Sequence, residues 1–260
     1  MLRADAVSFG YGDSGFLLSD ASVDITPGSL TGLLGPNGCG KTTLLKLLCG
    51  VLRPRTGRVT LGERPLAAMT RRELARHIAV VPQETHPAFE YSVTEMVMMG
   101  RHPHLGVFQL EGPADFEAAH EALDATGTAH LAARNYMTLS GGEKQRVIIA
   151  SALAQATEIL LLDEPTASLD LGYQLEVAGL LARLNRDRKV TMVLATHDLN
   201  LAASLCDRLV VMREGLVLAQ GPTSDVLTGA MVRRLYDVDA DVQFHQRAGH
   251  LTVVPVGRST

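Results

Sequence analysis

The chain has 260 residues, of which 46% are hydrophobic, and 24 Lys and Arg against 28 Asp and Glu leave a formal net charge of −4. This composition is typical of a globular protein with one or two domains and excludes a peptide-sized scaffold. The balanced charge gives no reason to expect nucleic acid as a partner, and every apolar stretch is shorter than the roughly 20 residues that a membrane-spanning helix needs.

The amino-terminal residues lack the apolar core of a signal peptide, so we expect the chain to reside in the cytosol. The three cysteines, Cys39, Cys49 and Cys206, match no zinc or redox spacing and are expected to be reduced.

In chain order, the first 30 residues alternate loosely and end at Pro27-Gly28, which predicts an antiparallel β element. Apolar segments at 29–34, 158–162 and 190–195 then read as buried parallel strands. A helix is expected over about 171–186, with its apolar face formed by Leu175, Ala178, Leu181 and Ala182. Strands alternating with helices predict an α/β core.

Strand patterns disappear between Gln83 and about Ala156, where helix starts appear instead. One of these, Ser92 to Glu95, fits a capping box with Gly100 as the expected helix stop. We therefore expect a helical insertion at about 84–156. Later in the chain, hairpins are predicted from the pairs of segments 208–212 with 217–219 and 242–245 with 251–254.

One glycine-rich segment follows the strand 29–34 and precedes a helical pattern, as the P-loop fingerprint requires. It reads Gly35, Pro36, Asn37, Gly38, Cys39, Gly40, Lys41, Thr42, followed by Thr43. Backbone N–H groups of such a loop converge on phosphate, the lysine bridges the β- and γ-phosphates, and the Thr42 hydroxyl can ligate Mg²⁺. The context disfavours an ordinary glycine turn.

Two carboxylates, Asp163 and Glu164, end the apolar segment that begins at Ile159. An ionised carboxylate at the end of a buried strand needs a partner, and a nucleotide-bound Mg²⁺ would provide one for Asp163. Glu164 is then placed to orient or deprotonate a water that attacks the γ-phosphate. The alternative is a strand that ends in solvent, where two acidic residues are merely soluble.

A second candidate phosphate site is Ser140-Gly141-Gly142, at the start of a helical segment. One nucleotide needs only one such cradle, so this one would contact a nucleotide held by another subunit. The alternative is an ordinary N-cap serine.

These segments together resemble the nucleotide-binding subunit of ATP-binding cassette (ABC) transporters over residues 1–235. The Walker A, Q-loop, signature, Walker B, D-loop and switch-histidine motifs correspond, in this order, to Gly35–Thr42, Gln83, Leu139–Glu143, Ile159–Glu164, Ser168–Asp170 and His197. The resemblance implies the fold class: α/β, a P-loop NTPase nucleotide-binding domain of the ABC type with an N-terminal antiparallel β element and an inserted α-helical subdomain. Glu143 departs from the glutamine that is commonest there.

The resemblance also implies roles for individual residues. Tyr11 would stack on adenine, with Phe9 as its rival if the register slips, and a core aromatic as the alternative. Gln83 would sense Mg²⁺ and the γ-phosphate, and the Mg²⁺ ligands would be Thr42, Gln83 and Asp163. Catalysis would use Glu164, His197, Gln83 and Lys41, and Asp170 would lie across a dimer interface.

The implied mechanism is a head-to-tail homodimer that ATP closes and hydrolysis reopens. The segment 96–106 resembles ATPase subunits of iron-siderophore, haem and cobalamin importers, whose permeases are separate chains. We therefore expect an integral-membrane permease dimer as partner, a substrate-binding protein as indirect partner, no nucleic acid, and a peripheral location on the cytoplasmic face of the membrane. ATP and Mg²⁺ are the expected cofactors.

Three points stay open at this stage. A soluble ABC ATPase that acts in iron–sulfur cluster assembly or on ribosomes or DNA is the alternative function. Met96, Met98 and Met99 either contact the permease or fill the core of the helical subdomain. Residues 236–260 form a C-terminal extension in which we expect a β-hairpin, and the cargo is not encoded in this subunit.

Overall fold

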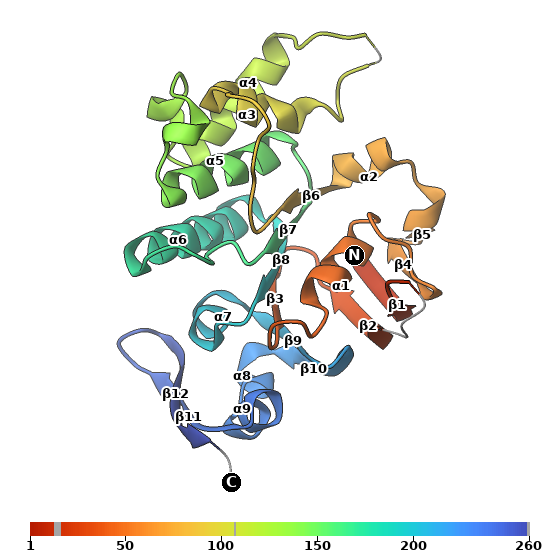
Figure 1. Cartoon of the computed structure of the whole chain (residues 1–260), viewed down its shortest axis with the longest axis vertical. Coiled ribbons are helices and arrows are strands. Elements are labelled where there is room, and N and C mark those ends of the chain that lie inside the picture. The colour runs from red at the N-terminus through yellow and green to blue at the C-terminus, as the bar shows by residue number, and fades with distance from the viewer. Residues whose placement is uncertain (13–16, 107, 259–260) are drawn as a thin grey trace. The chain divides into compact units, whose positions relative to one another are not determined.

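The computed structural model describes residues 1–12, 17–106 and 108–258 (Figure 1). The chain divides into two compact units, one formed by Met1–Met69 with Thr191–Thr260 and the other by Thr70–Val190. Strands and helices occur in both units, with an antiparallel sheet at the front of the chain and helices between residues 93 and 154. The predicted α/β architecture with these two features is confirmed.

The first unit begins with an antiparallel sheet in the order β2-β1-β4-β5. Its strands are β1 (Leu2–Phe9), β2 (Leu18–Ile25), β4 (Thr56–Leu61) and β5 (Arg64–Pro65). A 3₁₀ turn, η1 (Leu66–Ala68), follows β5. The sequence predicted the β1–β2 pair but not the β4–β5 hairpin, whose turn residue Gly62 has a positive φ of 61°.

The same unit contains strands in the order β10-β9-β3-β8. They are β3 (Leu30–Leu34), β8 (Thr191–Thr196), β9 (Arg208–Arg213) and β10 (Leu216–Pro222). β3 runs parallel to both β8 and β9, and all residues of β3 and β8 are buried. Parallel strands are covered on both faces, which explains their continuous apolar sequence. Helices α1 (Lys41–Leu48) and α7 (Leu199–Leu205) both contact β8.

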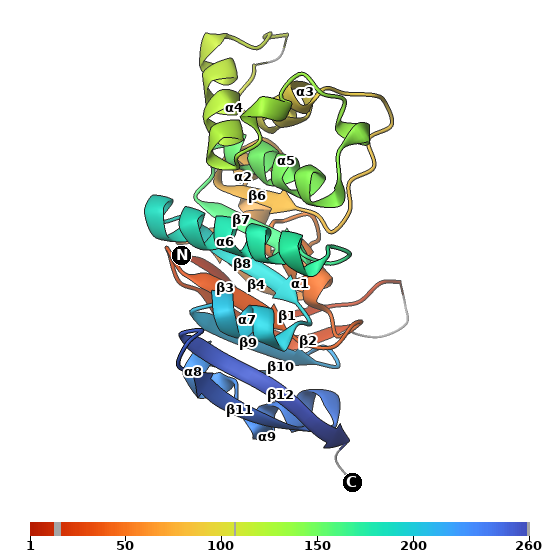
Figure 2. The ribbon, with the colours of Figure 1, turned by 90° about the vertical axis from the view of Figure 1, so that its left-hand side faces the viewer.

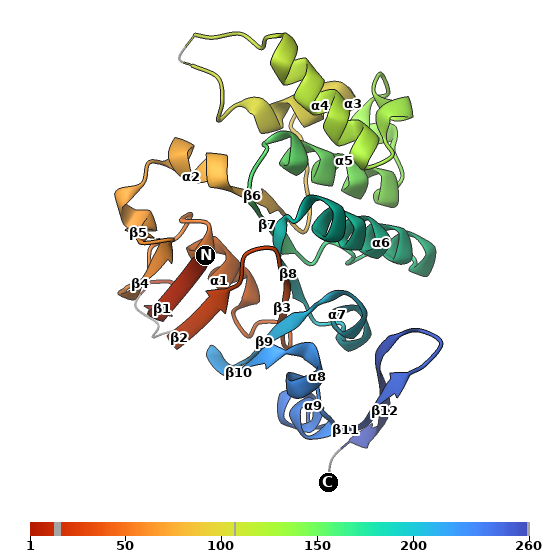
Figure 3. The same ribbon diagram turned by 180° about the vertical axis from the view of Figure 1, so that it is seen from behind.

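The C-terminal part of this unit holds α8 (Thr223–Val226), α9 (Gly229–Tyr236) and a hairpin of β11 (Val238–His245) with β12 (His250–Arg258). β11 contacts α9, and β12 contacts α7 (Figure 3). The two strands are longer than the segments expected from the sequence. Their pairing extends from His245–His250 to Val238–Arg258.

The second unit contains two parallel strands, β6 (Ile78–Val81) and β7 (Ile159–Asp163). Its helices are α2 (Arg71–His77), α3 (Val93–Met98), α4 (Pro113–Ala125), α5 (Gly141–Ala154) and α6 (Leu171–Arg188), with 3₁₀ turns η2 (Met99–Arg101), η3 (Ala129–Leu131) and η4 (Tyr136–Thr138). α3, α4 and α5 pack on one another (Figure 2). Within the described ranges, no helix combines the length and apolar character needed to cross a membrane.

Two details differ from the sequence expectations. Of the predicted face of α6, Leu181 is buried but Leu175 is 66% exposed. The buried residues of α6 are Val177, Leu180, Leu181 and Leu184. α3 ends at Met98, and Gly100 lies in η2, where a Cβ would come within 2.0 Å of the Ser151 carbonyl oxygen. Gly100 is therefore needed for close packing, not as a helix stop.

Buried sulfur side chains fill the core. Met96 and Met98 are 4% and 7% exposed, so both are core residues, whereas Met99 is 39% exposed. The three cysteines are free thiols, and burial raises the pKa of the Cys206 thiol.

Candidate functional site

The glycine-rich loop connects the buried strand β3 to the amino end of α1. Gly40 caps α1 with a φ of 107°. The ammonium group of Lys41 donates to the carbonyl oxygens of Gly35 at 2.9 Å and Pro36 at 3.1 Å, and this lysine is only 5% exposed. Its charge is thus held against the loop, and the exposed Thr42 follows it in the first turn of the helix.

Close packing explains why two positions of this loop are glycine. A Cβ at Gly35 would come within 2.2 Å of the carbonyl oxygen of Met212 in β9. A Cβ at Gly40 would come within 2.6 Å of Leu18 Cδ2, and its backbone has the positive φ that side chains rarely adopt. The loop conformation is therefore specified by the strands packed beside it.

His197 and the glycine-rich loop both follow the carboxyl ends of paired parallel strands. β3 and β8 pair in parallel with Leu34 opposite Thr196, and His197 directly follows Thr196. The amide of Asp198 donates to the Thr196 hydroxyl at 3.0 Å, while the Asp198 carboxylate caps α7. The first unit thus brings together the loop with Lys41 and the exposed His197 at the carboxyl ends of neighbouring strands, where α/β folds bind ligands.

Three predicted residues lie where the parallel strands of the second unit end. Val81 pairs with Leu162, Asp163 is the last residue of β7, and Glu164 and Gln83 follow the carboxyl ends of β7 and β6. Both carboxylates are half-buried and Gln83 is exposed. The backbone of Glu164 has a φ of 47°, and a non-glycine residue held in this region costs about 1–3 kcal/mol and marks a constrained position.

The start of α5 packs against the start of α6. Ser140 caps α5 in a capping box: its amide donates to Glu143 Oε2 at 2.8 Å, and the Glu143 amide donates to the Ser140 hydroxyl at 3.3 Å. Hydrogen bonds to the Glu143 carboxylate, from the Ser140 amide first and from the Ser140 side chain second, hold the pKa of this carboxyl below its usual range. Glu143 therefore serves as a cap here, which accounts for its place in the motif.

Gly142 and Asp170 share one neighbour, Tyr173. A Cβ at Gly142 would come within 2.3 Å of the Tyr173 ring, so only glycine fits. The Asp170 carboxylate accepts from the Tyr173 amide at 3.0 Å and caps α6. The second unit thus brings the Ser140–Gly142 segment and Asp170 together, through a tyrosine that the sequence analysis did not single out and that no pattern marks.

The two candidate adenine-stacking aromatics differ in exposure. Tyr11 is 50% exposed, whereas Phe9 is 9% exposed and meets the Tyr11 ring edge-on at 4.9 Å between centroids. Of these two rings, Tyr11 is therefore the more exposed.

The segment after α3 is held by buried polar contacts. Arg101 donates to Asp115 Oδ1 at 3.0 Å and to the carbonyl oxygen of Ala154 at 2.7 Å, and His104 Nε2 lies 2.8 Å from the carbonyl oxygen of Gln155. The Gly112 amide and Arg101 together lower the pKa of Asp115. Arg101 and His104 therefore fix this segment to the carboxyl end of α5.

Comparison with known proteins gives a consistent result. A family model described as ABC transporter matches residues 18–167. The ferric enterobactin transport ATP-binding protein FepC of Escherichia coli (strain K12) is 38% identical over 99% of this chain and 95% of that protein. The hemin import ATP-binding protein HmuV of Bordetella pertussis (strain Tohama I) is 41% identical over 88% of this chain and 89% of that protein.

A solved structure extends the similarity to the fold. An ABC transporter that is described as of the metal-chelate type, in an inward-facing conformation, has a chain that superposes with a TM-score of 0.86 at 31% identity. The alignment covers 98% of this chain and 96% of that one. The similarity thus includes the C-terminal hairpin as well as the nucleotide-site motifs.

Proposed function

This chain belongs to the ABC transporter family, and from that premise we propose that it is the ATP-hydrolysing subunit of an importer for a metal chelate. Two copies bind ATP head to tail, hydrolysis separates them, and this opening and closing drives a separate permease. The observation that carries the proposal is the arrangement of the first unit, where the Lys41 loop and His197 lie at the carboxyl ends of paired strands. This arrangement holds a phosphate chain and contacts its terminal group.

The nucleotide is held by the loop Gly35–Gly40 together with Lys41, Thr42 and Thr43. Backbone N–H groups and the helix terminus bind the phosphates, and Lys41 bridges the β- and γ-phosphates. Tyr11 stacks on the adenine, an interaction of about 1–3 kcal/mol by analogy with stacking in nucleic-acid complexes. Its 50% exposure supports this assignment over Phe9.

Hydrolysis uses Glu164, Gln83 and His197. Glu164 orients and deprotonates the attacking water, while His197 donates a hydrogen bond to the γ-phosphate. The left-handed backbone of Glu164 and the parallel register of β6 and β7 support these roles, because both restrict where the carboxylate can lie.

A divalent cation fits the side chains available. Thr42, Gln83 and Asp163 offer only oxygen donors, which suits a hard ion such as Mg²⁺. The half-buried Asp163 also has a reason for its charge if it faces a cation. When bound, Mg²⁺ would neutralise charge on the phosphates.

The second subunit completes each site. Ser140, Gly141 and Gly142 contact the γ-phosphate held by the partner, and Asp170 lies across the interface. The capped amino end of the 14-residue helix α5 supports this role, since its N–H groups and dipole favour an anion. Loss of the γ-phosphate removes charge-assisted hydrogen bonds between the subunits, and the dimer opens.

The cargo is an iron-siderophore, haem or cobalamin, and the partner is a many-spanning permease dimer that places this subunit at the cytoplasmic face of the membrane. The two relatives act in ferric enterobactin transport and hemin import, which supports a siderophore or haem, and the similar metal-chelate type transporter supports the class. A substrate-binding protein would act through the permease.

The test is the substitution Glu164→Gln with Glu158→Gln as a matched control. Glu158 is an exposed carboxylate just before the opposite end of β7. Glu164→Gln should retain ATP binding, lose nearly all turnover and accumulate as an ATP-bound dimer, whereas Glu158→Gln should behave as the unchanged protein. Ordinary turnover in Glu164→Gln would contradict its role as the base.

The same variant tests the partner. Affinity purification of Glu164→Gln with Mg-ATP from detergent-solubilised membranes of the host should recover a many-spanning permease, whose identity narrows the cargo. Recovery with ribosomal, DNA-repair or cluster-assembly proteins would refute transport while leaving the ATPase chemistry intact.

A further inference from the structure

The C-terminal segment contacts the backbone that carries His197. Tyr236, the last residue of α9, donates a hydrogen bond from its hydroxyl to the carbonyl oxygen of His197 at 3.1 Å. The bond joins positions 39 residues apart. It therefore acts on the peptide that directly precedes α7 and helps to set the direction in which the His197 side chain leaves the strand end.

The hairpin makes a second contact with the same segment. Asn200, three residues beyond His197, donates from Nδ2 to the carbonyl oxygen of Val253 at 3.1 Å and accepts from the Val253 amide at 2.8 Å. One side-chain amide thus satisfies both backbone groups of Val253, which is only 2% exposed in β12. The Asn200 side chain therefore makes the two hydrogen bonds with Val253 that a neighbouring strand would make, and it fixes the start of α7 to the hairpin.

A polar clamp holds α9 next to the glycine-rich loop. Arg213 donates from both terminal nitrogens to the Asp237 carboxylate, at 3.2 and 3.0 Å, and from Nε to Glu214 at 3.2 Å. The hydrogen bonds from Arg213 to Asp237 and Glu214 raise the pKa of Arg213, with Asp237 the larger cause. The Gly215 amide in the same turn donates to the carbonyl oxygen of Cys39 at 3.1 Å.

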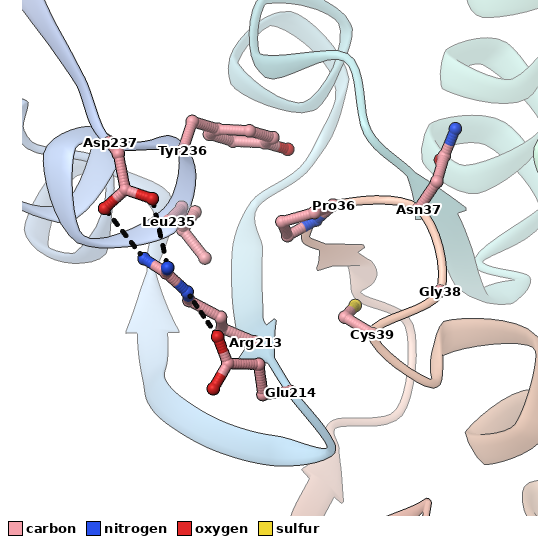
Figure 4. A pocket seen from close by; sticks show the side chains of 9 residues that line it. All are labelled: Pro36, Asn37, Gly38, Cys39, Arg213, Glu214, Leu235, Tyr236 and Asp237. Carbon is pink, nitrogen blue, oxygen red and sulfur yellow. Dashed lines mark hydrogen bonds and ion pairs between the residues drawn. The ribbon is translucent and has the colours of Figure 1, made fainter. Parts of the chain in front are cut away.

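Arg213, Glu214, Tyr236 and Asp237 line a pocket of about 410 Å³ (Figure 4). One wall is Pro36 to Cys39 of the glycine-rich loop, and the other includes the dipeptide Tyr236-Asp237. Asp237 is therefore tied to the turn that supports the loop, while Tyr236 is tied to the His197 backbone. Two adjacent residues of the C-terminal segment thus connect both parts of the nucleotide site in this unit.

We propose that the C-terminal segment positions His197 for hydrolysis. Two positioning residues carry this effect: Tyr236 at the end of α9, and Asn200 in α7, which receives the hairpin. The proposal rests on the proposed function, because it assigns a task to His197 in ATP turnover. The C-terminal segment restrains the backbone at the His197 carbonyl and at Asn200 just beyond it, so that the imidazole is already oriented when the γ-phosphate arrives.

The first test is Tyr236→Phe, which removes one hydroxyl and keeps the ring. Tyr91→Phe is the matched control, because the Tyr91 ring meets Phe89 edge-on in the other unit. We expect kcat for ATP to fall about three- to tenfold in Tyr236→Phe, the range of one hydrogen bond between neutral groups. The KM for ATP should match that of Tyr91→Phe, and stability should fall by no more than one such hydrogen bond contributes.

The second test observes the imidazole itself. In protein labelled with ¹³C-histidine, the signal of His197 is identified by its loss in His197→Gln. Tyr236→Phe and Asn200→Ser should each shift this signal, and Tyr91→Phe should leave it in place. Asn200→Ser shortens the side chain so that it no longer spans both backbone groups of Val253, and it should also lower kcat.

The outcomes separate the two proposals. A wild-type chain without ATPase activity would contradict the proposed function itself. An active wild type with Tyr236→Phe at unchanged kcat, or with an unmoved His197 signal, would overturn the positioning role alone. A fall in kcat accompanied by a loss of stability larger than one hydrogen bond contributes would also overturn it, since general loosening would then be the cause.

Discussion

The contact between Gly142 and Tyr173 yields a prediction for the packing of α5 against α6. In Gly142→Ala, the new Cβ would lie 2.3, 2.6 and 2.9 Å from three carbons of the Tyr173 ring. All three are closer than real Cβ contacts, and one is Cγ at the base of the ring, so the whole side chain must rotate. Overpacking of this kind costs about 1–3 kcal/mol.

A helical alanine also brings a gain that must be subtracted. Alanine is favoured over glycine within a helix by about 1 kcal/mol. With the strain at the upper end of its range, Gly142→Ala should lower the free energy of unfolding by about 2 kcal/mol. The control Gly179→Ala lies in α6, where a Cβ meets nothing within 4 Å, and it should be stabilised by about 1 kcal/mol.

The assay is urea unfolding followed by circular dichroism, without nucleotide, so that stability is separated from dimer closure. In a Tyr173→Ser background, where the ring is absent, adding Gly142→Ala should cost much less stability than it does in the wild type. If Gly142→Ala and Gly179→Ala gain stability equally, the Tyr173 ring does not lie against Gly142 and the reasoning fails.

Three further changes test other contacts. Ser140→Arg should spare nucleotide binding by the monomer but block ATP-dependent dimerisation in light scattering, and a normal dimer would count against the shared site. Gly35→Ala should lose nucleotide binding measured with a fluorescent ATP analogue, because its Cβ would be 2.2 Å from the Met212 carbonyl oxygen, a backbone atom that cannot rotate away. Because the pKa of Asp115 is lowered in the folded protein, its carboxylate stabilises the fold above the unfolded pKa, and this stability is lost as the pH falls below about 4. The urea midpoint should therefore fall less steeply with decreasing pH in Asp115→Asn than in the wild type. Equal slopes would refute this.

Several of the core strands and one helix start could be predicted from the sequence. The segments 29–34, 158–162 and 190–195 predicted β3, β7 and β8 to within one residue, because a strand covered on both faces is apolar throughout and ends sharply. Ser92 with Glu95 likewise marked the start of α3, since a capping box is a local interaction.

Errors arose where a tertiary contact decides. The predicted apolar face of α6 is right at Leu181 but wrong at Leu175, because the buried face turns toward Val177 and Leu184. Helical periodicity gives the spacing of a face but not which neighbour covers it. Gly100 resembled a helix stop for the same reason, because only the position of Ser151 shows that it serves close packing. β6 and α2 were missed, although Thr70 and Glu73 form a capping box that marks the start of α2.

The nucleotide motifs can be predicted from the sequence, whereas the contacts that orient them cannot. Backbone N–H groups of consecutive residues form the phosphate-binding loop, so the loop with Lys41 can be found without a structure. The orientation of His197 instead depends on Tyr236 and Asn200, through bonds that span 39 and 53 residues and follow no repeat. Motifs therefore identify which groups act, while distant hydrogen bonds set how well they are oriented, and the C-terminal segment is where this subunit can differ from other cassettes without altering a motif.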